Sequence, residues 1–322
     1  MIVYEAKVGS RQNRVFEKMC YTYVKQIDMN TNNKLPSFAL LFEQAVSLYT
    51  KNMRMSIVVA LLPAIFLATI DIIRPSFAAT PFSMGFLFAL EVICFAIYFV
   101  VVVTVPYMLV RIADMSMSGK TPATIDDLFT EAYPQTIPLF VVSILLLVMT
   151  IGAGTLYIIP VLILFCYLVF TASVFVIEKK RGFDVFVQSA WYVSGNFWAI
   201  AGRSSLLFLV FVGFAVALTG TIAIPFSSVL AVGPIANYVT QLVISLFWLP
   251  VSTNFYVLMY KALNAQKSST PDQAFSSRTK KVFVTLAATT VVVYVILVAK
   301  VGYTFSIEPV QDFIKQSLIS LY

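Results

Sequence analysis

The stretch 178–203 reads EKKRGFDVFVQSAWYVSGNFWAIAGR and lies between two long apolar runs. It opens on one acidic and three basic residues, and aromatic residues recur through the rest. It is too polar to cross a bilayer, because a charged side chain at the membrane centre costs about 3 kcal/mol. It is also too aromatic for an ordinary loop. This composition is typical of an amphipathic helix at a membrane surface.

The composition of the whole chain is typical of a protein embedded in a membrane. The chain has 322 residues, of which 60% are hydrophobic and only 11% charged, and its mean hydropathy is +0.89. Soluble domains carry about 25% charged residues. A water-soluble fold of this size has no means of burying so much apolar surface, so the sequence predicts an integral membrane protein.

The absence of histidine excludes several kinds of site. With no histidine in the chain, Ser-His-Asp and Cys-His nucleophiles, HExxH zinc sites and His-ligated haem are all ruled out. The three cysteines, Cys20, Cys94 and Cys166, have neither metal-ligand nor disulfide spacing. We therefore expect no metal, no cofactor and no enzymatic activity.

Seven apolar runs are long enough to cross a bilayer. They predict an all-α polytopic membrane protein with spans at 55–73, 84–110, 137–154, 157–177, 204–224, 238–260 and 283–301. With the N-terminus in the cytoplasm, 19 of the 22 Lys and Arg residues fall on the cytoplasmic side. This asymmetry predicts a cytoplasmic N-terminus and an extracytoplasmic C-terminus. It also explains the net charge of +7 better than nucleic-acid binding does.

A repeated unit precedes three pairs of spans. The segments that begin at Phe38, Ile125 and Phe183 align when Phe42, Phe129 and Phe186 are superposed. The first two have apolar residues at i, i+3, i+4, i+7 and i+8, which is the stripe of an amphipathic helix, and the third is broader. The sequence thus predicts an interfacial amphipathic helix followed by a two-span hairpin, used three times. The stretch 178–203 contains the third such helix.

Four regions follow from this pattern. They are a cytoplasmic segment with an amphipathic helix at 1–35, a six-span core at 36–264, a polar cytoplasmic linker at 265–281, and a seventh span with a short extracytoplasmic tail at 282–322.

The third repeat resembles the glycerophosphoryl diester phosphodiesterase membrane-domain family. The residues that carry the resemblance are Glu178, Lys180, Gly182, Ser189, Gly195, Asn196, Phe197 and Trp198, with Tyr256 and Tyr260 in "LPVSTNFYVLMYKAL". The resemblance implies a six-span fold that often occurs without assigned activity, and it suggests a bacterial or archaeal plasma membrane. An internal eukaryotic membrane is the alternative location. The catalytic barrel to which that domain is often fused is missing here, and the seventh span departs from the pattern.

The candidate contact residues lie around the third repeat. We expect lipid or partner contacts at Lys179, Lys180, Arg181, Trp191, Asn196, Trp198 and Arg203. Asn196 and Arg203 have alternative interpretations, as a helix cap and as an ordinary boundary arginine. Glu91 lies well inside the second span and is the candidate intramembrane polar site. A carboxyl group that stabilises helix packing is its simpler interpretation.

Two functions are consistent with these features. The first is a non-enzymatic membrane protein of lipid-interacting or scaffold character, with membrane phospholipids, a protein partner or a second copy as its contacts. The second is a transporter or permease for a small or amphipathic substrate, because repeats are common in transporters. Nucleic acid is not expected as a partner.

Overall fold

The computed structural model describes residues 35–63, 65, 84–120, 124–156, 158–223, 233–267 and 270–319. Within these ranges every regular element is a helix and no strand occurs. Five helices are long and apolar enough to cross a membrane: Tyr98–Met117, Ile125–Gly154, Ile159–Ile177, Phe197–Thr221 and Gln273–Ile296. The chain is all-helical, as the sequence predicts, and its apolar helices are those of a membrane-embedded protein.

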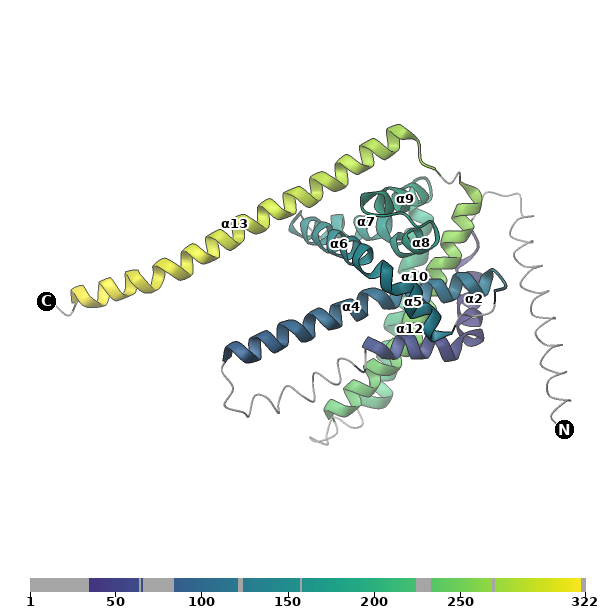
Figure 1. The fold of residues 1–322 in the computed structure, drawn as a ribbon, viewed down its shortest axis with the longest axis horizontal. Coiled ribbons are helices and arrows are strands. Elements are labelled where there is room, and N and C mark those ends of the chain that lie inside the picture. The colour runs from purple at the N-terminus through teal and green to yellow at the C-terminus, as the bar shows by residue number, and fades with distance from the viewer. Residues whose placement is uncertain are drawn as a thin grey trace.

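Figure 1 shows the helices gathered into a bundle, with α13 running along one side and extending past the other described helices. In chain order they are α2 (Phe38–Lys51), a helix at Met53–Pro63, α4 (Met84–Met117), α5 (Ile125–Ala132), the 3-10 helix η1 (Tyr133–Gln135), α6 (Thr136–Leu156), α7 (Ile158–Leu168), α8 (Thr171–Ile177), α9 (Phe183–Val193), α10 (Phe197–Leu218), the π-helix η2 (Thr219–Ala223), α12 (Gly233–Gln266) and α13 (Gln273–Ile319).

Several predicted boundaries differ from the structure. The span predicted at 204–224 begins earlier, because α10 starts at Phe197. Much of the predicted linker 265–281 is helical, since α13 starts at Gln273. The span predicted at 238–260 lies in α12, which is not among the five apolar helices. The N-terminal segment 1–34 and nearly all of the second half of the span predicted at 55–73 lie outside the described residues.

Helix α2 packs on α12 through one stripe of its surface. Leu41, Ala45 and Tyr49 are buried at i, i+4 and i+8, the spacing that places side chains on one helix face. The Asn254 amide of α12 donates a hydrogen bond of 3.3 Å to the Ala45 carbonyl oxygen. Ser37 caps the helix by accepting from the Leu40 N–H. The amphipathic pattern of the sequence therefore corresponds here to a protein contact.

Helix α5 begins with a capping box and continues almost directly into α6. The Thr124 hydroxyl accepts from the Asp127 N–H, and the Asp127 carboxylate accepts from the Thr124 N–H. Pro134 stands in the 3-10 turn that joins the two helices. Leu128 and Ala132 are buried, whereas Tyr133 is 83% exposed. One part of the apolar stripe predicted for this helix therefore packs inside the protein, and the other part is exposed on its surface.

Helix α9 is enclosed by the protein. Eight of its 11 residues are buried, and α13 covers it, as Figure 1 shows. The rings of Phe186 and Phe283 meet edge to face at 6.1 Å, and Lys280 of α13 pairs with Asp184 at 3.3 Å. The sequence predicts this helix at a membrane surface, whereas in the structure its aromatic face packs on the helix bundle.

Helices α6 and α13 approach closely at one glycine. A Cβ atom at Gly152 would lie 1.8 Å from the Thr290 hydroxyl oxygen and 3.2 Å from the Leu286 carbonyl oxygen. Only glycine leaves room for this contact. Small residues at such positions allow membrane helices to pack closely, so Gly152 fixes where α13 lies on the bundle.

Candidate functional site

A five-residue loop connects α8 to α9 and begins the candidate site. Glu178 ends α8, with its N–H donating to the Val174 carbonyl oxygen. Lys179 has a positive φ of 56°, a conformation that often ends helices. Gly182 has φ 55° and ψ −138°, a combination that essentially only glycine adopts. The basic-glycine loop of the sequence therefore has a backbone role: it turns the chain so that α9 packs beside α8.

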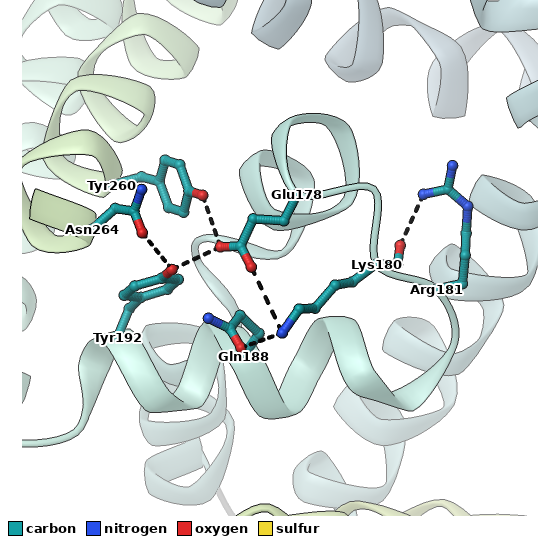
Figure 2. A network of polar contacts seen from close by, with 7 residues as sticks. All are labelled: Glu178, Lys180, Arg181, Gln188, Tyr192, Tyr260 and Asn264. Carbon is teal, nitrogen blue, oxygen red and sulfur yellow. Dashed lines mark hydrogen bonds and ion pairs between the residues drawn. The ribbon is translucent and has the colours of Figure 1, made fainter. Parts of the chain in front are cut away.

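Glu178 is the centre of a polar cluster, which we call the carboxylate hub: Glu178, Lys180, Gln188, Tyr192, Tyr260 and Asn264. Figure 2 shows these side chains converging from the loop, α9 and α12. One Glu178 oxygen accepts hydrogen bonds from the hydroxyls of Tyr192 and Tyr260, both at 2.8 Å. Its other oxygen lies 3.7 Å from the Lys180 ammonium. A single carboxylate thus connects three parts of the chain.

The tyrosine protons can be assigned from the geometry. The Tyr192 oxygen lies 2.8 Å from Glu178 and 2.7 Å from the Asn264 side-chain oxygen. A hydroxyl has one proton to donate, and the charged carboxylate is the stronger acceptor. Turning the Asn264 amide by 180° then presents its NH₂ group to the Tyr192 oxygen, an assignment that coordinates alone leave open. With this arrangement both contacts of Tyr192 are satisfied.

Burial and the hub carboxylate both act on Tyr192. Removal of the ring from water raises the pKa of Tyr192 above its ordinary value, and the hydrogen bond and charge of Glu178 raise it further. A phenolate beside a carboxylate would suffer charge repulsion in a poorly hydrated site. Tyr192 therefore stays protonated and acts as a hydrogen-bond donor.

The charged groups of Lys180 and Arg181 bond to other groups of the protein. The Lys180 ammonium donates to the Gln188 side-chain oxygen at 2.6 Å, in addition to its contact with Glu178. Arg181 donates to the Phe175 and Lys180 carbonyl oxygens at 3.1 and 2.8 Å, and to the Gln135 side chain. Its guanidinium also stacks on the Phe175 ring, 4.1 Å from the centroid. Of the four basic residues proposed for lipid or partner contact, Lys179 is the exposed one.

The span formed by α7 and α8 is interrupted, and Ser189 of α9 fills the interruption. The Ser189 hydroxyl donates to the Tyr167 carbonyl oxygen at 2.7 Å and accepts from the Phe170 N–H at 3.3 Å. The Thr171 hydroxyl donates to the Leu168 carbonyl oxygen at 2.6 Å. Backbone polar groups at membrane depth need partners, and these two side chains supply them.

Lys267 holds the other end of α9. Its ammonium donates to the carbonyl oxygens of Trp191, at 2.5 Å, and of Ser194, and it lies 5.1 Å from the centre of the Trp191 ring. A lysine placed on the last carbonyls of a helix satisfies acceptors that have no partner within the helix. Burial lowers the pKa of Lys267. Trp191 also meets Phe275 of α13 edge to face at 5.1 Å.

The remaining predicted residues lie outside the hub. Asn196 is the N-cap residue of α10 and makes no side-chain capping bond there. Trp198 is 83% exposed on the first turn of that helix. Arg203 donates to the carbonyl oxygens of Leu35, Pro36 and Ala199 at 2.8–2.9 Å. Arg203 therefore joins α10 to the start of α2. Glu91 lies within α4, and its side chain is outside what the structure describes.

A second ionic cluster ties α4, α5 and α12 together. Asp114 accepts from Lys261 at 2.7 Å and lies 3.5 Å from Arg111, and Arg111 donates to Glu131 at 2.9 Å. These pairs join three helices, as the hub does for its own elements. Over the described ranges no group of three or more His, Cys, Asp or Glu side chains is placed to hold a metal ion.

Sequence reasoning missed Gln188, Tyr192, Asn264 and Lys267 as members of the site. Gln188 and Tyr192 are one turn apart in an otherwise apolar helix, and Ser189 lies next to them. Polar residues inside an apolar helix need partners when the helix is buried, and that signal could have been used. Asn264 and Lys267 carried no such signal, because they lie at a polar helix end.

Comparison of the chain with protein-family models, curated proteins and solved structures gives no match. The function must therefore be argued from the chain's own residues.

Proposed function

We propose that this chain is a non-enzymatic, multi-pass membrane protein that contacts membrane lipids and acts as a scaffold. The observation that carries the proposal is how the charged groups of the candidate site are used. Glu178, Lys180 and Arg181 are bonded to one another or to neighbouring protein groups. Such a network stabilises an arrangement of helices, and it offers no nucleophile with an adjacent base.

The exposed surface supports lipid as the principal contact. Trp198 is 83% exposed at the start of a candidate span, the position where tryptophan is enriched at membrane interfaces. Large apolar side chains are exposed along α10 and α13, among them Leu206, Phe208, Leu209, Val216, Val291, Tyr294 and Val295. Acyl chains cover such surfaces without further specificity, and the tryptophan adds an anchor at the headgroup level.

The finer organisation belongs to the same proposal. The distribution of basic residues supports seven spans and a cytoplasmic N-terminus. The helices α2, α5 and α9 support a threefold repeat of a helix before a pair of spans, in which α2 and α9 pack on the bundle. A plasma-membrane location is supported by the family resemblance. The resemblance to the glycerophosphoryl diester phosphodiesterase membrane-domain family supports a non-catalytic membrane domain. Among its motif residues, Glu178, Ser189 and Tyr260 each bond to another helix here.

Native mass spectrometry of the protein in lipid nanodiscs tests this function. We expect stoichiometric phospholipid to remain bound to the wild type and to be reduced in Trp198→Ala, while Trp198→Phe keeps it. Arg203→Ala examines whether this residue also reaches a lipid phosphate beyond its three carbonyl partners. If a protein partner or a second copy of the chain co-purifies in place of lipid, the scaffold binds protein and not lipid. Bulk lipid alone, unchanged in every variant, would contradict the proposal.

A transporter is the second candidate, and the interruption between α7 and α8 favours it. Discontinuous helices near the membrane midplane often form the binding sites of transporters. Flux into proteoliposomes, measured for a panel of small and amphipathic solutes, tests this function. If a flux is found and Glu91→Gln leaves it unchanged while Glu178→Gln abolishes it, the hub is the site of coupling. If no solute crosses, the scaffold is retained.

A further inference from the structure

The helical interruption between α7 and α8 lies in a stretch without the residues that usually break helices, and the one local polar contact that the structure describes there is the Thr171 hydroxyl bonding back to the Leu168 carbonyl oxygen. Residues 167–173 read YLVFTAS and contain neither proline nor glycine, the residues that usually break helices. Pro160 lies too far before the interruption to explain it, since a proline disturbs the turn that precedes it. The local sequence thus suits a helix that continues from α7 into α8.

The interruption is imposed from outside by α9. The Ser189 hydroxyl accepts from the Phe170 N–H and donates to the Tyr167 carbonyl oxygen, replacing bonds that a continuous helix would make within itself. Ser189 and Phe170 are both fully buried, so water is not available to substitute for this hydroxyl. The bent conformation therefore depends on α9 staying in place.

Only a small backbone change separates the bent form from a continuous helix. Phe170 has φ −93° and ψ 5°, which lies beside the helical region near −63° and −42°. In a continuous helix the Phe170 N–H would donate to the Cys166 carbonyl oxygen, four residues earlier. Both forms thus give the Phe170 N–H and the Tyr167 carbonyl oxygen a partner, so joining the helices leaves neither group unpaired.

We propose that Ser189 is a latch: while it occupies the interruption the span is bent, and when α9 withdraws α7 and α8 join into one continuous helix. The joined helix turns Glu178, which directly follows α8, away from Tyr192 on α9. The latch and the hub are therefore coupled, because Ser189 and Tyr192 lie one turn apart on α9. This inference is independent of the lipid-scaffold proposal, and a working latch would favour the transporter alternative.

The test measures the distance between spin labels on either side of the interruption in nanodiscs. The labels replace Leu162 of α7 and Lys179 after α8, both exposed, in a background without the three native cysteines. Ser189→Ala is expected to raise the population of a second distance by about fivefold, the effect of losing one hydrogen bond. Ser189→Thr keeps a hydroxyl and restores the wild-type distribution.

The matched control is Ser252→Ala, which removes a hydroxyl whose one bond within the described ranges is to the Leu249 carbonyl oxygen of its own helix. A single unchanged distance in Ser189→Ala would overturn the latch, and so would an equal shift in Ser252→Ala. If spin labelling disturbs the fold, hydrogen exchange at the Phe170 amide tests the latch without labels. The latch predicts that this amide stays protected in Ser189→Ala, because the joined helix bonds it. Faster exchange at Phe170 in Ser189→Ala would contradict the latch. It would mean that α7 and α8 stay separate and that the Phe170 N–H has lost its acceptor.

Discussion

Helices α9 and α10 are neighbours in sequence, joined by three residues, yet one is buried and the other faces outward. Phe186 and Tyr192 of α9 have no exposed surface, whereas α10 has only Ile200 and Leu207 buried. Both helices are strongly apolar. They differ in how their polar residues are distributed. Gln188, Ser189 and Tyr192 of α9 bond to the loop before the helix, to the interruption between α7 and α8, and to α12, whereas the polar residues of α10 are confined to 203–205 and its last 13 residues are apolar. The comparison teaches that hydropathy predicts removal from water, and that polar residues bonded to several other elements indicate which helix is enclosed by protein.

The largest expected effect comes from removing the hub carboxylate. In Glu178→Ala the Tyr192 and Tyr260 hydroxyls lose their charged acceptor, and Lys180 loses its counter-charge. We expect the free energy of unfolding to fall by about 3 kcal/mol, measured by thermal unfolding in nanodiscs. Glu43→Ala is the control, because Glu43 is an exposed carboxylate on α2. Equal destabilisation by the two variants would contradict the special role of the hub.

A smaller effect is expected at the contact between α6 and α13. Gly152→Val introduces a side chain where even a Cβ atom lies 1.8 Å from the Thr290 hydroxyl. We expect about 2 kcal/mol of destabilisation from overpacking, together with faster hydrogen exchange in the first half of α13. Gly213→Val on the outward-facing α10 is the matched control, since nothing lies within 4 Å of its Cβ position. A neutral Gly152→Val would show that α13 is not packed on α6.

Alkaline pH should act on the buried helix through Tyr192. Because the folded-state pKa of Tyr192 is raised, its contribution to stability is complete below the unfolded pKa of about 10 and is lost as the pH rises above it. We expect the melting temperature of the wild type to fall more steeply above about pH 10 than that of Tyr192→Phe. Parallel curves for the two proteins would mean that Tyr192 is not buried beside a carboxylate.

The smallest effect is expected at the exposed ion pair of α13. Lys280 and Asp184 have side chains 51% and 65% exposed, and pairs of this kind contribute about 0.5 kcal/mol. Lys280→Ala should therefore lower the melting temperature only slightly, and Lys281→Ala, its exposed neighbour, should do the same. A loss of more than about 1 kcal/mol for Lys280→Ala alone would assign this pair a larger part in holding α13.

The sequence predicted the elements better than their surroundings. Helices at α2, α5 and α9 follow from apolar periodicity. The burial of α9 did not follow, because part of what encloses it, in addition to the preceding helices α7 and α8, comes from α12 and α13, far along the chain. The interruption at Phe170 could not be predicted from the sequence either, because it involves hydrogen bonds between Ser189 and residues 19 and 22 positions earlier in the chain. Arg203, assigned to a lipid phosphate or a helix boundary, instead binds the carbonyl oxygens of Leu35 and Pro36.

Hydrogen exchange of the α9 backbone in nanodiscs tests most directly whether the 178–203 stretch is an enclosed structural element. The account predicts that amides of 185–193 exchange as slowly as those of the buried part of α12 at 251–263, because eight of these nine residues are buried in the protein. Exchange as fast as in the more exposed helix α5 would contradict it, and would return this stretch to the membrane surface.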